Sequence, residues 1–210
     1  MVDVMFGEGY VFSAFPFLHG CADQCVTTRK VKTEEYIRYG DVVRFISGYQ
    51  GGSYLGAGVG ATIAGAVDDV GTYSFINGYD AVTQWVIFSL GGATDNGNVI
   101  RSCDRMAILA IKNEASLVLF GNTFLLNSDF GVATGNGSAV WHILIDSNAN
   151  DNPSLVAGDR LHLLNDFNNG AGFLETRNHA SPGSGFLFNV SASYFYNRDA
   201  SSGTWQVVRA

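Results

Sequence analysis

The sequence predicts an all-β fold, a β-trefoil built from three four-stranded repeats. Three observations predict it. A strand that begins with a small residue and an aspartate occurs three times, one tryptophan follows each copy at the head of another apolar strand, and the chain has 26 glycines against 3 prolines. Three units are too few for a β-propeller, which needs at least about four blades. A closed barrel capped by hairpins lets three such units bury one shared face.

The first strand of each repeat follows a Gly-Asp or Cys-Asp pair: Gly40-Asp41, Cys103-Asp104 and Gly158-Asp159. The aspartates are 63 and then 55 residues apart, a spacing with room in each unit for about four short strands. A catalytic centre needs unlike groups at one point, whereas repeats place like groups around an axis. We therefore expect each aspartate to accept backbone N–H bonds where its strand begins.

A turn or short loop leads from the first strand of each repeat into the second. The loops are residues 48–53, 112–115 and 165–172, and the strands after them begin near Tyr54, Leu117 and Phe173. The first loop is rich in glycine, and the third is rich in glycine, asparagine and aspartate; these residues tolerate positive φ and so form hairpin turns. Third strands are predicted at 71–76, 122–126 and 186–190, with a long loop or weak hairpin at 56–71.

One tryptophan per repeat heads the last strand. These residues are Trp85, Trp141 and Trp205, and each is followed by apolar residues. This pattern predicts three tryptophans packed in the core in equivalent positions, with each indole N–H bonded to one partner.

The domain prediction is an N-terminal arm at residues 1–33 and a trefoil domain at 34–210, with repeats at about 34–98, 99–153 and 154–210. The arm is rich in aromatic residues, namely Phe6, Tyr10, Phe12, Phe15 and Phe17. We do not expect it to be a secretory signal, because it carries Asp3 and Glu8 and no basic residue near its start. An apolar arm needs a cover, so we expect it to pack on its own barrel or to mediate a homo-oligomer or larger assembly.

Composition excludes two classes of partner. The net charge is −7, with lysine only at positions 30, 32 and 112, which argues against nucleic acid. No apolar run reaches the roughly 18 residues that a membrane span requires.

The three cysteines are Cys21, Cys25 and Cys103. An odd count without a signal peptide favours a cytoplasmic location, with non-classical export as the alternative, or else one disulfide and a free thiol. His19, Cys21 and Cys25 provide too few ligands for a closed zinc site, so we expect no metal. Cys103 takes the glycine position of its repeat and is expected to be a small buried residue.

No catalytic motif is present: the sequence has no G-x-S-x-G, no H-E-x-x-H and no phosphate-binding glycine loop. The four histidines lie in unrelated contexts, which favours structural roles. We therefore expect no catalytic residues, no cofactor and no enzymatic activity.

The repeats resemble a known family. The segments 39–45, 54–55 and 85–87 are similar to the MIR-type β-trefoil repeat, with its Gly-Asp strand, aromatic-Leu strand and Trp-led strand. Repeat three matches at Gly158-Asp159, Phe173-Leu174 and Trp205, whereas repeat two has Cys103 and Leu117-Val118 in place of the usual residues. The resemblance covers roughly residues 36–208. It implies the trefoil fold and a recognition or assembly domain.

Two functions remain open. The first is a lectin-like carbohydrate-binding module whose ligand residues are Tyr49, Gln50, Asp166, Asn168 and Asn169. Aromatic faces and planar amide or carboxylate groups are the chemistry that holds sugars. The ricin-type Gln-x-Trp signature is absent, which argues against a galactose pocket of that type. The alternative is a structural or protein-interaction subunit that associates through the N-terminal arm.

Overall fold

The computed structural model describes residues 35–74, 80–92, 95–125, 129–146, 153–170 and 172–210. The described chain is all-β, with short 3₁₀ helices in some connections. The 3₁₀ helices are η4 (Tyr49–Gly51), η5 (Ala81–Thr83) and η7 (Phe167–Asn169). The strands are β1 (Val42–Ser47), β2 (Ser53–Ala57), β3 (Ala66–Tyr73), β4 (Trp85–Ser89), β5 (Arg105–Ala110), β6 (Leu117–Leu125), β7 (Asp129–Gly135), β8 (Trp141–Ile145), β9 (Arg160–Asn165), β10 (Gly172–His179), β11 (Phe188–Ser193) and β12 (Trp205–Arg209).

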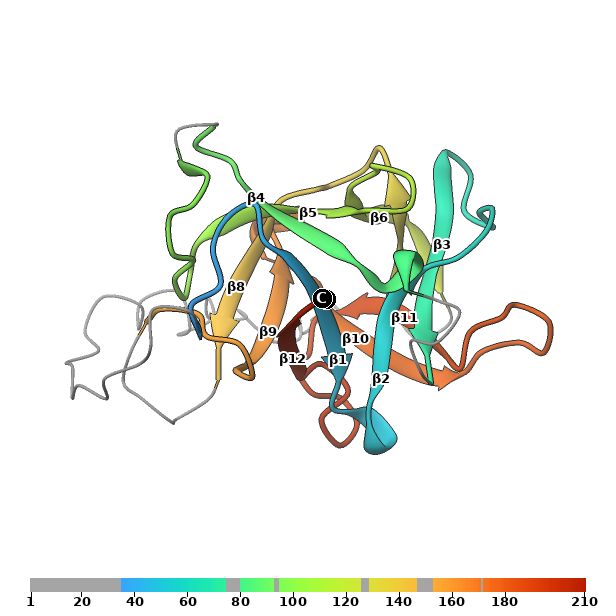
Figure 1. Cartoon of the computed structure of the whole chain (residues 1–210). Coiled ribbons are helices and arrows are strands. Elements are labelled where there is room, and N and C mark those ends of the chain that lie inside the picture. The colour runs from blue at the N-terminus through green and yellow to red at the C-terminus, as the bar shows by residue number, and fades with distance from the viewer. Residues whose placement is uncertain (1–34, 75–79, 93–94, 126–128, 147–152, 171) are drawn as a thin grey trace, which may run out of the picture.

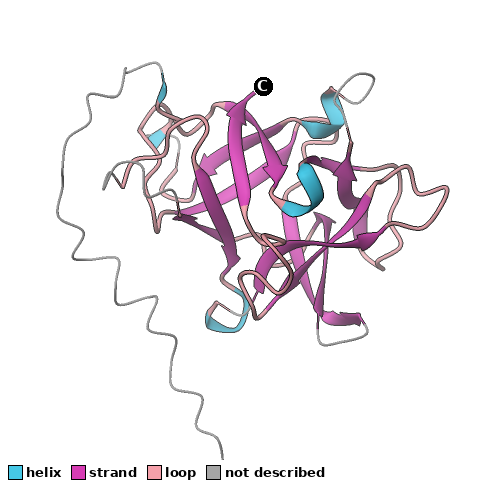
Figure 2. Cartoon of the chain, turned by 90° about the horizontal axis from the view of Figure 1, so that it is seen from below, coloured by secondary structure: helices cyan, strands magenta, loops and turns pink. Residues whose placement is uncertain are grey.

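The twelve strands belong to one sheet that closes on itself as a barrel (Figure 1). One path runs β1-β12-β9-β8-β5-β4, and the antiparallel pairing of β4 with β1 completes the ring. The sheet continues from β1 through β2, β3, β7 and β11 to β10, which pairs back to β9. In Figure 2, the strands surround a common interior and the loops lie around it. Closure leaves few free strand edges.

This topology corrects the predicted fold class. The structure is a closed β-barrel formed by one continuous sheet, and the prediction of a three-fold β-trefoil of four-stranded repeats is wrong. Pairing crosses the predicted repeat boundaries at β4–β5, β8–β9 and β12–β1, so no four strands form a unit of their own. The three repeats also differ in how their second strand pairs. In repeats one and three the second strand pairs with the first, as β2 does with β1 and β10 with β9. In repeat two, β6 pairs among the described strands only with β7.

The sequence repetition is nevertheless visible in local contacts. The segments before β1, β5 and β9 meet at one end of the barrel, where three fully buried residues are linked in a cycle. Ile37 N–H donates to Leu155 O (2.9 Å), Leu155 N–H to Ile100 O (2.8 Å) and Ile100 N–H to Ile37 O (3.1 Å). This cycle closes the barrel end with apolar side chains and satisfied backbone groups.

The expected role of the repeated aspartates is confirmed. In each repeat the carboxylate accepts the backbone N–H of the residue three positions earlier, with distances of 2.9, 2.8 and 2.9 Å for Asp41, Asp104 and Asp159. The residue before the aspartate has positive φ in all three turns, with values of 93°, 72° and 96° at Gly40, Cys103 and Gly158. The small residue and the aspartate together therefore form the turn that starts each first strand.

The tryptophan prediction is also confirmed in its local detail. Trp85, Trp141 and Trp205 begin β4, β8 and β12 and are fully buried. Their indole N–H groups donate to the backbone carbonyls of Leu55, Leu117 and Leu174 at 3.0, 2.8 and 2.9 Å. Each ring thus binds the second strand of its own repeat, which satisfies the one donor that burial would otherwise leave unpaired.

Several third-strand boundaries are corrected. Only residues 58–65 separate β2 from β3, so the predicted loop at 56–71 is much shorter. In repeat two, residues 122–125 belong to β6, and the third strand is β7. The reason is Gly121, which lies inside β6 next to a register shift between Phe120 and Phe124. Glycine within a strand marks such irregularities and can be mistaken for a turn.

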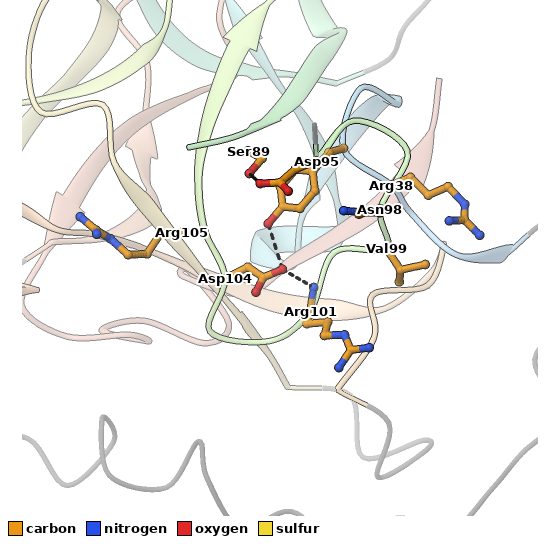
Figure 3. Close-up of a pocket in the computed structure, with 9 residues that line it drawn as sticks. Arg38, Ser89, Asp95, Asn98, Val99, Arg101, Asp104 and Arg105 are labelled. Carbon is orange, nitrogen blue, oxygen red and sulfur yellow. Dashed lines mark hydrogen bonds between the residues drawn. The ribbon is translucent and has the colours of Figure 1, made fainter. Parts of the chain in front are cut away.

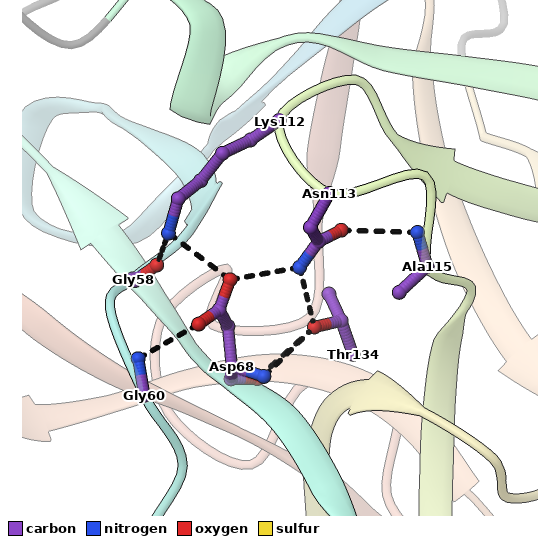
Figure 4. A network of polar contacts seen from close by, with 7 residues as sticks. All are labelled: Gly58, Gly60, Asp68, Lys112, Asn113, Ala115 and Thr134. Carbon is purple, nitrogen blue, oxygen red and sulfur yellow. Dashed lines mark hydrogen bonds and ion pairs between the residues drawn. The ribbon is translucent and has the colours of Figure 1, made fainter.

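A buried polar network joins β3 to the β5–β6 connection and to β7 (Figure 4). Asp68 Oδ2 accepts hydrogen bonds from Lys112 Nζ (3.0 Å) and Asn113 Nδ2 (2.8 Å), and Asp68 Oδ1 accepts the N–H of Gly60 (2.7 Å). Asn113 also donates to Thr134 Oγ1 (3.0 Å). Burial alone would raise the pKa of Asp68, but the bonds from Lys112, Asn113 and Gly60 outweigh it and lower that pKa.

Cys103 is disulfide-bonded, which agrees with the alternative of one disulfide and a free thiol, and it is half-buried instead of buried as expected. A disulfide is unusual in the reducing compartment that the sequence favoured, and the location stays a prediction. The predicted arm, residues 1–33, lies outside the described residues, and its role in association also stays a prediction. No helix in the described ranges is long and apolar enough to cross a membrane.

Candidate functional site

The predicted ligand residues lie in two similar loops. Tyr49 and Gln50 belong to η4, between β1 and β2, whereas Asn168 and Asn169 belong to η7, between β9 and β10, directly after Asp166. The loops contact different parts of the barrel. Ser47, before η4, pairs with the first residue of β12, while Asn165, before η7, pairs with the first residue of β8. The five residues therefore do not form one site.

The η4 loop presents only part of the expected chemistry. The Tyr49 ring is half-buried and makes a T-shaped contact with Phe188 on β11, with ring centroids 5.3 Å apart. Gln50 is exposed and adopts a φ of 45°. The aromatic ring thus packs mainly against the protein, and Gln50 alone faces solvent fully.

In the η7 loop, Asp166 is a structural anchor. Its Oδ2 accepts a hydrogen bond from Arg105 Nη2 on β5 at 2.8 Å, and its Oδ1 lies 3.3 Å from His142 Nε2 on β8. Burial would raise the pKa of Asp166, but the bonds from His142 and Arg105 outweigh this effect and lower it. The carboxylate stays ionised and fastens the loop to two strands, which leaves it less free to accept bonds from a ligand.

Asn168 and Asn169 are exposed, and both have positive φ, 48° and 61°. Asparagine tolerates this conformation better than most residues, which explains why two of them stand here. Each amide offers two donors and one acceptor oxygen to solvent. Both amides are therefore open to solvent, and their role as ligand residues stays a prediction.

Three exposed aromatic residues in the β11–β12 connection were not predicted from the sequence. Tyr194, Phe195 and Tyr196 have 42%, 65% and 49% of their surfaces exposed. The signal was present in the sequence, as a run of three aromatics that no buried strand requires. The Tyr196 ring makes edge contacts with His162 and Phe173, with centroids 5.3 and 6.2 Å away.

Phe130 connects these aromatics to the η7 loop. Its buried ring lies 5.5 Å from the Phe167 ring in η7 and 5.2 Å from the Tyr194 ring, centroid to centroid. Strand pairing agrees, because the start of β10 pairs with the end of β9 on one side and with the end of β11 on the other. Phe130 thus links η7, which carries Asn168 and Asn169, to Tyr194 at the start of the aromatic run. We call this set of five, Asn168, Asn169, Tyr194, Phe195 and Tyr196, the aromatic–amide surface.

No group of three or more histidine, cysteine or acidic side chains within the described ranges is placed to hold a metal ion. His19, Cys21 and Cys25, the residues considered for zinc, lie outside those ranges.

Comparison with known proteins gives likenesses of structure only. No family model and no curated protein matches the sequence. The SDF2-like protein from Arabidopsis thaliana is similar with a TM-score of 0.68 and 12% identity, over 82% of this chain and 94% of that protein. A Caenorhabditis elegans protein of unknown function gives 0.67 and 14%, over 85% and 99% of the two chains.

A third likeness is to a chain of the Saccharomyces cerevisiae protein O-mannosyltransferase Pmt1–Pmt2 complex bound to the sugar donor. It has a TM-score of 0.68 and 13% identity, and covers 83% of this chain but only 25% of that one. At such identities these likenesses concern the fold. They support the MIR-type resemblance at that level, while membership of the family is not shown.

Proposed function

We propose that this protein is a non-enzymatic carbohydrate-recognition module that binds a saccharide at the aromatic–amide surface. The observation that carries this proposal is that the β11–β12 connection exposes three aromatic rings and η7 exposes two amides, while the buried Phe130 ring contacts both Tyr194 and Phe167 of η7. Sugars pack their C–H faces on aromatic rings and exchange hydrogen bonds with planar amides. The likeness to part of a mannosyltransferase complex bound to its sugar donor supports a carbohydrate-related role.

The surface is held in place before any ligand arrives, which favours affinity because less ordering entropy is lost on binding. Asp166 fastens η7 to Arg105 and His142. On the aromatic side, Phe195 N–H donates to Ser193 Oγ at 3.2 Å. Asp166 is thus a positioning residue, whereas the amides and rings provide the contacts. In the proposal, Tyr49 and Gln50 form a separate and smaller contact.

Exposed aromatic residues also favour docking to another protein, so a structural or protein-interaction subunit is the second candidate function. The two functions differ in the partner that the aromatic–amide surface binds. A saccharide needs the amides as well as the rings, while a protein partner is held mainly by the buried area of the rings.

A glycan-array screen tests the proposal. We expect the wild-type protein to bind a defined subset of glycans and Phe195→Ala to weaken that binding about threefold to tenfold, because it removes a stacking face. Asn168→Ala should weaken it as well. Val59→Ala is the matched control, since it truncates an apolar residue that is 94% exposed in the β2–β3 loop. A wild-type protein that binds no glycan, or a Phe195→Ala variant that binds as well as the wild type, would contradict the proposal.

A further inference from the structure

A polar cleft of about 580 Å³ lies where the start of the first repeat meets the β4–β5 connection (Figure 3). Its walls come from residues 38–39, from the β4–β5 connection with Ser89, Asp95, Asn98 and Val99, and from residues 101, 104 and 105 at the start of β5. The volume is in the range of small-ligand sites, about 300 to 1,000 Å³. None of the residues of the aromatic–amide surface lines this cleft.

Two carboxylates are fixed inside the cleft. Tyr39 Oη donates to Asp104 Oδ2 at 2.9 Å, and Ser89 Oγ donates to Asp95 Oδ2 at 2.6 Å. Burial, followed by the hydrogen bond to Asp104, raises the pKa of Tyr39 well above its usual value, so the phenol remains a donor. Within the described part of the chain, both carboxylates use Oδ2 for these bonds. Each therefore keeps a second oxygen that can accept a hydrogen bond from a ligand hydroxyl.

Two guanidinium groups stand at the rim. Arg38 forms a β-bridge with Val99, and Arg101 lies two residues after Val99. Because side chains two residues apart in an extended segment share a face, the side chains of Arg38 and Arg101 lie on the same face of this bridged pair. Figure 3 shows both pointing outward from the cleft. Arg38 Nη1 donates to Gly97 O at 2.7 Å, and the Arg101 guanidinium has no bond to any described residue. Arg105 is already paired with Asp166 and points away.

This arrangement combines hydrogen-bond acceptors inside with cations outside, on a chain whose net charge is −7. A simple anion would be attracted by the rim but repelled by Asp95 and Asp104. A neutral sugar would bind the carboxylates of Asp95 and Asp104 but would give the guanidinium groups of Arg38 and Arg101 no anionic partner. A ligand that carries hydroxyl groups next to one carboxylate satisfies both, because arginine binds carboxylates through two parallel hydrogen bonds.

We infer that this cleft is a binding site for an acidic saccharide, with sugar hydroxyls bonded to Asp95, Asp104 and Asn98 and the carboxylate bonded to Arg38 and Arg101. The site is separate from the aromatic–amide surface and does not depend on it. Because the rim is exposed, its contribution is screened by salt and binding falls as ionic strength rises.

Titration of the ¹⁵N-labelled protein with glucuronic acid, glucose and sodium acetate tests the site. Glucuronic acid is expected to shift the backbone resonances of residues 38–39 and 95–104 in a saturable way, at least tenfold more tightly than glucose or acetate. If acetate binds as tightly as glucuronic acid, the site recognises only a negative charge. If glucose binds as tightly as glucuronic acid, Arg38 and Arg101 do not contribute to binding. Either result, or no binding of glucuronic acid, overturns the inference.

Arg101→Gln gives the second readout, and its side chain is exposed, so the fold should be retained. It should weaken glucuronic acid binding about tenfold. Arg177→Gln on β10 is the matched control, because it removes the same charge away from the cleft walls, and it should bind normally. Equal weakening in both variants would show only a general charge effect and would contradict the site. Phe195→Ala should leave this binding unchanged, which separates it from the proposed function.

Discussion

Phe195 and Trp205 are ten residues apart in the sequence and have opposite roles. Phe195 has 65% of its surface exposed and contacts the saccharide in the proposed function, whereas Trp205 is fully buried and bonded to Leu174 O. The sequence predicted the burial of Trp205, because one tryptophan heads the last strand of each repeat. It did not predict a role for Phe195, because the link between its neighbour Tyr194 and η7 passes through Phe130, 64 residues before Tyr194 in the chain.

At the residue scale, Trp205→Phe should destabilise the protein by about 1–3 kcal/mol. The variant keeps an aromatic ring but loses the indole N–H, so the buried carbonyl of Leu174 loses its donor and a small void remains. Urea unfolding measures the change. Gln206→Ala is the neighbouring control, since Gln206 is exposed, and should cost less than about 0.5 kcal/mol. Equal stability of Trp205→Phe and the wild type would show that the indole bond is unimportant.

At the element scale, the network around Asp68 joins parts that are distant in sequence. Lys112 and Asn113 follow β5, Thr134 lies in β7, and Asp68 lies in β3. The sequence could not predict this contact, because loop 112–115 shows only that a turn exists there. In repeat two, a third strand was predicted at 122–126, whereas β6 continues through Gly121 to Leu125.

Asp68→Asn should lower stability by about 1–3 kcal/mol at pH 7, because Lys112 then lacks its charged partner at a largely buried site. The pKa of Asp68 is lower in the folded state than in the unfolded chain, so the ionised form stabilises the protein above the unfolded pKa of about 4. This contribution disappears as pH falls through the folded pKa.

Urea unfolding of wild type and Asp68→Asn at pH 7, 5 and 3 measures this effect. The gap between the two proteins should be constant from pH 7 to 5 and should narrow toward pH 3. Asp69→Asn is the control, because Asp69 bonds to Thr62 in an exposed turn and should change stability little. A gap that grows on acidification would show that the sign of the pKa shift is wrong.

At the scale of the whole molecule, the turns and strands within each repeat were predictable from the sequence, whereas the way in which the strands join into a closed barrel was not. The Gly/Cys-Asp turns and Trp-led strands fix where each repeat begins and ends, and both were located from sequence. How the strands join depends on pairings such as β3–β7 and β7–β11, which unite different repeats. The result is one closed barrel instead of the predicted three-fold trefoil. Of the candidate site, Asn168 and Asn169 were proposed from the sequence, which stays a prediction, and the three exposed rings were not.

The central claim is that a saccharide binds where the β9–β10 and β11–β12 connections meet. Backbone NMR of the ¹⁵N-labelled protein tests it most directly, by titration with neutral oligosaccharides that end in mannose, glucose or galactose. At least one of these should shift the resonances of residues 167–169 and 194–196 in a saturable way, since aromatic stacking changes the local magnetic environment. Shifts confined to other residues, or no saturable shift with any of the three, would contradict the account.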